Sequence, residues 1–168
     1  MTVLEAIQKR ASIRKYEEQP LEPETLAKIL EAGRLAPTAA NSQATKVVAV
    51  QDKALLEALV PACNNQAFIG TAAAVLVVCS SSKRTMSCGQ VAGSIDCSIA
   101  LSFMMLEAAA EGVGSCWIGA FDAKKVADVL QIPEEYTPVA LAPFGYPAEE
   151  GRHVVYKPME DFLVKEHF

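Results

Sequence analysis

The sequence has very little histidine, and its cysteines follow no metal-binding spacing. Only two of the 168 residues are histidines, His153 and His167, and both lie near the C-terminus. The five cysteines include no C-x-x-C pair, the spacing that zinc and iron–sulfur sites commonly use. A Ser-His-Asp triad, a histidine-activated cysteine and a bound metal are therefore not expected. Cys88, between Ser87 and Gly89, is the cysteine expected to be exposed.

The sequence also lacks an excess of basic residues and a long apolar run. It holds 15 Lys and Arg against 20 Asp and Glu, a formal net charge of −5, so no nucleic-acid groove is expected. The longest apolar run, residues 72–79, is too short to span a bilayer. Glu5 interrupts the apolar stretch near the N-terminus, so we expect no signal peptide, no membrane partner and a cytoplasmic location.

The composition that remains suits one globular domain over residues 1–168, because 51% of the residues are apolar and 21% are charged. The capping-box sequence Thr2–Glu5, Pro23 at a first helical position and apolar periodicity predict helices over residues 3–10, 23–36, 53–60, 94–111 and 122–130. Short β-rich runs predict strands over residues 45–51, 72–79, 114–119 and 137–146. The run 72–79 is continuously apolar, so this strand is expected to be buried on both faces.

The predicted helix over residues 94–111 has two unusual properties. One is an apolar stripe at helical spacing, made of Ile95, Ile99, Phe103, Leu106 and Ala110. The other is a high content of Ala, Ser and Met, and small residues allow a second helix to approach closely. A dimer interface and an ordinary buried helix both fit this composition.

Residues 147–168 follow the last predicted strand and lack enough apolar periodicity to form a unit alone, although Val154, Val155 and Tyr156 lie among them. We expect a C-terminal tail that packs on another surface, with a partner subunit as the candidate.

Three cationic side chains, Arg10, Arg14 and Lys15, gather around Ser12 in the sequence RASIRKY. The segment is either a solvated turn or part of a site for a small anion, since the acidic chain offers no broad basic field. No G-x-G-x-x-G motif follows a predicted strand and no Walker loop is present. Neither common nucleotide-binding loop is therefore predicted.

Four sequence stretches occur in one order: RASIRKY at 10–16, APTAANSQ at 36–43, GVGSCWIGAFD at 112–122 and GYP at 145–147. Together, and over nearly the whole chain, they resemble the nitroreductase family of FMN-dependent oxidoreductases. The resemblance implies an α+β fold in which helices wrap a mostly antiparallel sheet. It also implies an intertwined homodimer with FMN at the subunit interface, which would give the tail 147–168 a surface to pack on.

The resemblance assigns one group of residues to the polar ends of FMN. The phosphate and ribityl chain are assigned to Arg10, Ala11 and Ser12. The second basic residue over the phosphate is either Arg152, the better match, or Lys157. The N1 and O2 edge of the flavin is assigned to Arg14, whose positive charge favours the anionic reduced form. Two more residues fall near a position on that edge, namely Asn65 and Gln66.

The resemblance assigns two further groups to the flavin ring and its surroundings. The loop that meets the flavin of the partner subunit contributes Pro37, Thr38, Ala39, Asn41 and Gln43. One face of the ring is lined by Cys116, Trp117, Ile118 and Gly119. Backbone N–H groups near Ile118 and Gly119 are expected to point at N5 and O4.

The sequence departs from the family pattern at three places. Phe68 stands near a position where some relatives carry a lysine, which makes the charge of Arg14 more important. Ala44 and Thr45 stand where many relatives have proline and a large aromatic residue. The link 80–93 is short, so we expect an open site whose lid, if any, comes from Met86 and Cys88.

The activity that the resemblance implies is hydride transfer from NADH or NADPH to flavin N5, and then to an electron-poor acceptor such as a nitroaromatic or a quinone. The mechanism is expected to be ping-pong, and no catalytic side chain is assigned because the cofactor carries the chemistry. Two alternatives keep the same fold and the same FMN site. One is a flavin carrier or sensor without efficient turnover, and the other is an FMN enzyme of another reaction type, such as ene reduction, dehalogenation or flavin breakdown.

Overall fold

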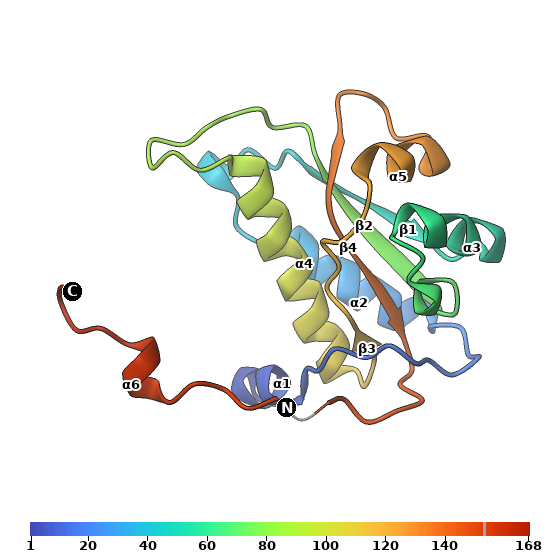
Figure 1. The fold of residues 1–168 in the computed structure, drawn as a ribbon, viewed down its shortest axis with the longest axis horizontal. Helices are drawn as coiled ribbons and strands as arrows, with labels where there is room; N and C mark the ends of the chain where they lie inside the picture. The colour runs from blue at the N-terminus through green and yellow to red at the C-terminus, as the bar shows by residue number, and fades with distance from the viewer. Residues whose placement is uncertain (153) are drawn as a thin grey trace.

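The computed structural model describes residues 1–152 and 154–168. A four-stranded antiparallel sheet forms the centre of the molecule, with strand order β1-β2-β4-β3. Its strands are β1 (Thr45–Val50), β2 (Ala74–Ser80), β3 (Gly114–Ser115) and β4 (Thr137–Gly145). The expected α+β fold with a mostly antiparallel sheet wrapped by helices is confirmed (Figure 1).

Five helices lie close to their predicted positions, namely α1 (Val3–Lys9), α2 (Pro23–Arg34), α3 (Lys53–Ala62), α4 (Ala92–Ala110) and α5 (Ala123–Leu130). The short α6 (Met159–Phe162) was not predicted. Single-turn 3₁₀ helices add η1 (Ala39–Asn41) and η2 (Ala67–Ile69). The capping box at Thr2 and Glu5 is present, and Asp122 caps α5 through the N–H of Lys125. The end of α3 differs from the prediction, because the helix continues through Pro61 and the N–H of Cys63 still bonds to Leu59.

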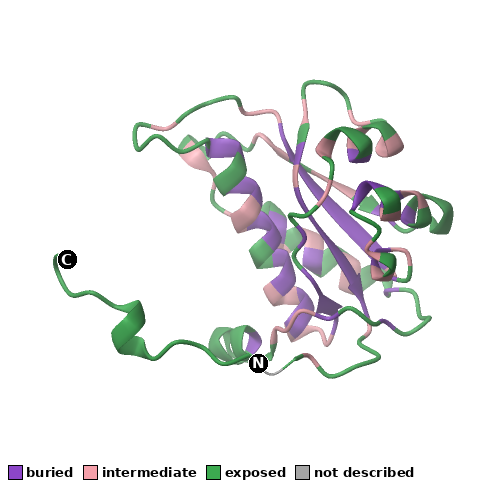
Figure 2. Cartoon of the chain, viewed as in Figure 1, coloured by how far each residue is buried: buried purple, intermediate pink, exposed green. Residues whose placement is uncertain are grey.

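Strand β2 is buried along its whole length, which confirms its expected burial on both faces. Successive side chains point to opposite faces of a strand. Val75 and Val77 face one apolar cluster, which includes residues of α3 and α5. Leu76 and Val78 face a second cluster, which includes residues of α2 and α4. The sheet therefore lies between two helical layers, with its second strand in the middle (Figure 2).

The predicted strand 114–119 is shorter than expected. Only Gly114 and Ser115 pair continuously with β4, and a separate bridge joins Ile118 to Leu141. The ladder is interrupted opposite Pro143, which has no N–H to donate although its carbonyl accepts a bond from Cys116 at 3.4 Å.

Helix α4 buries a face other than the apolar stripe noted in the sequence. The buried side chains include Cys97, Ala100, Leu101, Met104 and Ala108. The predicted stripe is turned outward: Ile95 and Phe103 are 36% and 40% exposed, and its other three residues are only partly buried. Because α4 carries apolar residues on both sides, its composition could not show which side meets the sheet. An apolar surface therefore remains uncovered on α4 in the single chain.

Helix α4 is also long and apolar enough to cross a membrane by length and composition, unlike the run 72–79 on which our expectation rested. More than half of that stretch is buried within the fold. Core helices of globular proteins meet the same criterion, so it does not indicate a membrane span here.

The C-terminal tail leaves the body of the fold after residue 152. The described residues from Val154 to Phe168 are all exposed, and they include Val155, Tyr156 and Phe162 at 86%, 73% and 81% exposure. Figures 1 and 2 show this segment extending away from the sheet with α6 in its middle. Exposed side chains of this size have no packing partner within the single chain.

Candidate functional site

The segment RASIRKY is an extended strand-like segment and not a turn. The N–H of Ile13 donates to the carbonyl of Ser115 at 3.0 Å, and Ser12 forms a parallel bridge to Ser115. On the other side of the segment, Ala148 donates to the carbonyl of Lys15. Ile13 and Tyr16 are buried, while Arg14 and Lys15 point to solvent. Of the two alternatives for this segment, the solvated turn is therefore wrong.

The guanidinium groups of this segment are not neutralised by nearby carboxylates. Arg10 is half-buried and Arg14 is exposed, and no ion pair involving either side chain occurs within the described ranges. The backbone N–H of Arg14 donates to Glu149 at 2.9 Å, which fixes the backbone but leaves the side chain free. Two cationic side chains are therefore available for a ligand.

A cavity of about 280 Å³ lies beside Arg10, at the C-terminal end of α4. Its lining includes Ala11, Ser115, Gly151 and the carboxylates of Glu149 and Glu150. Gly151 packs so tightly against Ala11 that any side chain at 151 would collide with it. This contact brings the start of the tail, and with it the exposed Arg152, next to Arg10.

Residues 116–119 alternate between buried and exposed positions. The side chains of Cys116 and Ile118 are only 1% and 5% exposed and belong to the core. Trp117 is 44% exposed, and a Cβ on Gly119 would lie 2.7 Å from the Trp117 ring. A ligand on this surface can touch Trp117 and Gly119, whereas it could reach Cys116 and Ile118 only through their backbone.

The N–H of Ile118 is already bonded, since it donates to the carbonyl of Leu141 at 2.8 Å. It is therefore not available to donate to a flavin. For the N–H of Gly119, no acceptor occurs among the described residues. Of the two backbone donors expected to point at N5 and O4, only the one at Gly119 is free.

Asn65 and Gln66 follow α3 in a turn with left-handed backbone at Asn64 and Asn65. Nε2 of Gln66 donates to the carbonyls of Cys63 at 2.9 Å and Ala120 at 3.1 Å. This side chain therefore holds the segment after Trp117 against the end of α3, and only its oxygen remains to accept a bond. Asn65 is exposed beside it.

The loop 37–43 has a strained backbone held by local hydrogen bonds. Ala40, Asn41 and Gln43 have φ values of 53°, 52° and 48°, in the left-handed region that non-glycine residues rarely adopt. The N–H of Gln43 donates to the hydroxyl of Thr38 at 3.0 Å, and its side chain donates to Asn41. Pro37, Asn41 and Gln43 are exposed.

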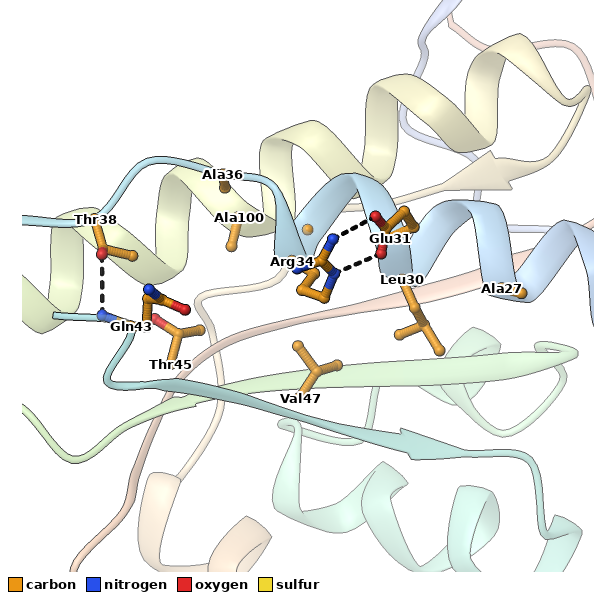
Figure 3. Close-up of a pocket in the computed structure, with 11 residues that line it drawn as sticks. Ala27, Leu30, Glu31, Arg34, Ala36, Thr38, Gln43, Thr45, Val47 and Ala100 are labelled. Atoms are coloured by element: carbon orange, nitrogen blue, oxygen red, sulfur yellow. Dashed lines mark hydrogen bonds and ion pairs between the residues drawn. The ribbon is translucent and has the colours of Figure 1, made fainter. Parts of the chain in front are cut away.

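A groove of about 420 Å³ lies beside this loop, between α2 and the free edge of β1 (Figure 3). Thr38 and Gln43 line one end of it, and Leu30, Val47 and Ala100 line its apolar wall. Arg34 also lines the groove, but its guanidinium makes two bonds of 2.6 Å to Glu31. Because that pair neutralises its charge, this groove is not an evident anion site.

A larger groove of about 840 Å³ lies on the other side of the N-terminal segment. Arg14 and Phe68 both line it. Phe68 is half-buried and packs on the core, so it supplies an apolar wall and no charge near Arg14.

The link between β2 and α4 forms a small loop with a bridge between Thr85 and Val91. Met86 is half-buried, and Cys88 is exposed as expected. The loop starts next to the loop 37–43, because Ser81 donates to the carbonyl of Ala44 at 3.1 Å. Whether Met86 and Cys88 cover a ligand stays a prediction.

The assigned residues form two groups at opposite ends of α4. Arg10, Ala11 and Ser115 lie beside the C-terminal end of α4, and the segment from Ser115 to Ala120 connects them to Gln66. The loop 37–43 lies at the N-terminal end (Figure 1). About 28 Å of helix separates the two ends at the usual rise per residue, because α4 has 19 residues. A single chain therefore does not bring the two groups together.

One residue near these groups was missed from the sequence. Asp96 in α4 is 3% exposed and accepts a hydrogen bond from the N–H of Ala39 at 3.0 Å. The sequence could have drawn attention to Asp96, because it is the only charged residue between Arg84 and Glu107. Among the described residues there is no cluster of three or more His, Cys, Asp or Glu that could hold a metal ion.

The same architecture occurs in known proteins. A sequence model of the nitroreductase family matches residues 7–81 and 62–146 of the chain. An NADH dehydrogenase of Thermus thermophilus is 31% identical over 85% of each chain. The FMN reductase [NAD(P)H] of Bacillus subtilis is 26% identical over 94% of this chain and 71% of its own length.

Solved structures agree with these sequence matches. A nitroreductase family protein of Clostridium novyi superposes with a TM-score of 0.84 and 30% identity, over 89% of this chain and 87% of the other. Another from Clostridium difficile gives a TM-score of 0.89 at 26% identity over the full length of both chains. The order of motifs, the sheet and the family match agree, and the chain belongs to the nitroreductase family.

Proposed function

We propose that the protein is an FMN-dependent oxidoreductase of the cytoplasm that uses NADH or NADPH to reduce an electron-poor acceptor such as a nitroaromatic or a quinone. The observation that carries the proposal is the distribution of the assigned residues over the two ends of α4. A two-fold axis that crosses α4 near its middle would bring the loop 37–43 of one chain next to residues 10–14 of the other. Such a dimer would hold two equivalent sites. The relatives named FMN reductase and NADH dehydrogenase support the flavin and the pyridine nucleotide.

The residues at the C-terminal end of α4 suit the shape and charge of FMN. Arg10 and Ser12 offer a free guanidinium and a hydroxyl for a phosphate, with Arg152 nearby as a second cation. Glu149 and Glu150 line the same cavity and would repel a dianion, so the bound phosphate must lie nearer to Arg10 than to these carboxylates. The indole of Trp117 and the bare backbone of Gly119 offer a flat surface for a ring.

Bound FMN supplies a hydride acceptor at N5 that can pass the hydride on to the second substrate. The task of Arg14 is to place a positive charge beside N1 and O2, where reduction adds negative charge. The free N–H of Gly119 would donate to the ring at its N5 and O4 side. Gln66 would hold that backbone in place through Ala120.

The same proposal accounts for the apolar surfaces that the single chain leaves uncovered. The stripe of Ile95 and Phe103 on α4 provides a self-complementary face for a two-fold dimer. The tail 147–168 would pack on the partner subunit through Val155, Tyr156 and Phe162. The groove beside the free edge of β1 (Figure 3) could receive such a segment, because an edge strand has unpaired backbone groups.

Subunit mixing tests this proposal directly. Arg14→Ala and Asn41→Ala would each inactivate both sites of a homodimer, since each site needs both residues. A mixed dimer of the two variants would contain one intact site and one doubly defective site. NADH- or NADPH-dependent reduction of a quinone should therefore reappear after the two inactive proteins are unfolded and refolded together. Arg10→Ala mixed with Arg14→Ala is the matched control and should restore nothing, because both residues belong to the same half-site.

Two results would contradict the proposal. If the purified protein is colourless and does not bind added FMN, FMN is not its cofactor. A protein that binds FMN but oxidises neither NADH nor NADPH over many turnovers with any acceptor would be a flavin carrier or sensor instead.

A further inference from the structure

Asp96 is a buried carboxylate that the fold of the single chain does not explain. It is 3% exposed, and Oδ2 has no hydrogen-bond partner among the described residues. Its neighbours on α4 are mostly apolar or small, including Gly93 and Cys97. A buried carboxylate with an unpartnered oxygen costs free energy of folding. Asp96 therefore needs a reason to be there that outweighs this cost.

The one hydrogen bond that Asp96 makes points to that reason. Oδ1 accepts from the backbone N–H of Ala39, which is 57 residues away in sequence and lies at the start of η1. A bond from a backbone N–H to a charged carboxylate is stronger than one to a neutral acceptor. This contact ties the loop 37–43 to the rigid α4.

The loop needs such an anchor because its backbone is unfavourable by itself. Ala40, Asn41 and Gln43 all have left-handed φ values, and none of them is a glycine. The bonds from Gln43 to Thr38 and to Asn41 are local and exposed, so they compete with water. Strained backbone persists only where surrounding structure holds it, and such strain concentrates at functional sites.

We propose that Asp96 is a positioning residue for the FMN site of the partner subunit: it fixes the N–H of Ala39 and thereby holds the loop 37–43 in the shape that meets the flavin. The inference rests on the proposed function, because it takes the loop to contact FMN across the dimer interface. It assigns a role in FMN binding to a residue that touches neither cofactor nor substrate. The buried carboxylate lowers the stability of each chain and increases its affinity for FMN by ordering the loop in advance.

The test measures FMN affinity and stability separately in four single variants and in the double variant Asp96→Leu/Ala39→Pro. Asp96→Leu removes both carboxylate oxygens. Ala39→Pro removes only the backbone N–H that donates to the carboxylate. Proline is compatible with residue 39, because it is the first residue of η1 and Thr38 before it is extended (φ −129°, ψ 153°). Asp96→Asn keeps an acceptor for Ala39 and serves as the rescue. Asp128→Leu, at an exposed position on α5, is the matched control for loss of an aspartate.

We expect Asp96→Leu and Ala39→Pro each to raise the dissociation constant for FMN by about tenfold or more, measured by quenching of flavin fluorescence. The double variant should bind FMN no more weakly than either single variant, since both substitutions remove the same hydrogen bond. Asp96→Asn should stay within about threefold of the original protein, and Asp128→Leu should be unchanged. The unfolding midpoint of the apo-protein with Asp96→Leu should be no lower than that of the original protein.

Amide hydrogen exchange supplies a readout that needs no cofactor and no folded Asp96→Leu protein. The Ala39 amide of the apo-protein should be protected, and Asp96→Asn should retain most of this protection. If the original protein binds FMN and the variants bind it equally well, the inference fails while the proposed function stands. A lower unfolding midpoint in Asp96→Leu with unchanged FMN affinity would also overturn it and make Asp96 purely structural. If the original protein binds no FMN, the proposed function fails.

Discussion

Gly114 leaves the space that the side chain of Ile13 occupies: a Cβ at residue 114 would lie 2.8 Å from Cγ1 of Ile13. Ile13 lies between Ser12 and Arg14, and its N–H is bonded to Ser115. The absence of a side chain at 114 thus allows the cationic segment to lie against the end of the sheet.

Gly114→Ala should therefore push the N-terminal segment away from β3. We expect a loss of about 1–3 kcal/mol in the free energy of unfolding, typical of overpacking, together with weaker FMN binding. Denaturant titration and FMN titration measure the two effects. Ile13→Ala should be less harmful in the Gly114→Ala background than in the original protein, because it removes part of the collision. Additive effects of the two substitutions would argue against the close packing.

Gln66→Glu tests the two hydrogen bonds by which Gln66 links the end of α3 to the segment after Trp117. A carboxylate cannot donate to the carbonyls of Cys63 and Ala120, so we expect about 1–3 kcal/mol less stability and weaker FMN binding. Gln8→Glu, at an exposed position on α1, is the matched control and should change neither. If FMN binding weakens while the free energy of unfolding stays the same, Gln66 contacts the flavin directly, as the family resemblance implies.

Arg14→Ala removes the charge proposed to lie beside N1 and O2. Loss of this contact should make the midpoint potential of bound FMN more negative and slow its reduction by about a hundredfold or more, which leaves the variant almost inactive. Spectroelectrochemistry and stopped-flow absorbance measure the two changes. Lys15→Ala removes a neighbouring exposed charge and should leave both values close to those of the original protein. Equal effects of the two substitutions would indicate a general electrostatic effect of positive charge and not a specific contact of Arg14 with the flavin.

Phe103→Asp places a charge on the uncovered stripe of α4. We expect the protein to become monomeric in analytical ultracentrifugation and to lose FMN, because each site would need both chains. Leu55→Asp is the matched control, since Leu55 on α3 is 39% exposed against 40% for Phe103. It should leave the dimer and the flavin content unchanged. A Phe103→Asp protein that stays dimeric would place the interface elsewhere.

The thiols should differ strongly in reactivity. Burial raises the pKa of Cys63 and Cys97 to about 11 and that of Cys79 to about 12, whereas Cys88 is exposed. At pH 8 a disulfide reagent should therefore modify one thiol quickly in the native protein, and Cys88→Ser should abolish this fast phase. A fast phase that survives Cys88→Ser would show that a buried thiol is accessible.

The same pKa shifts predict an alkaline loss of stability. A thiol whose pKa is higher in the folded than in the unfolded state holds its proton longer when folded. Its contribution to stability is complete below a pH of about 9, the unfolded pKa, and is lost as the pH rises toward 11–12. Urea unfolding at a series of pH values should show the free energy of unfolding decreasing over this interval. Cys79→Ala should flatten the decrease.

Most of the fold could be predicted from local patterns in the sequence. Caps at Thr2 and Asp122 and the run 72–79 placed their elements within about two residues, because these signals depend on neighbours in the chain. The face that α4 buries could not be predicted in this way. Both sides of that helix are apolar, and the choice between them depends on packing against α2 and the sheet.

The candidate site was predictable only as a set of motifs. The extended course of residues 10–16 depends on pairing with Ser115, about a hundred residues later in the chain. The link from Gln66 to Ala120 and the link from Asp96 to Ala39 are also long-range and leave no periodic trace in the sequence. The buried side chains of Cys116 and Ile118 likewise follow from the register with β4 and not from their own identity.

The position of β2 has a consequence for synthesis on the ribosome. All seven residues of this strand are buried, and it is covered on one edge by β1 and on the other by β4. Residues 137–145 emerge some sixty positions after it, so a nascent chain must carry an apolar strand with one unpaired edge until they have been synthesised. Premature termination anywhere before residue 137 would leave that edge permanently open, and the resulting fragments should aggregate or require a chaperone.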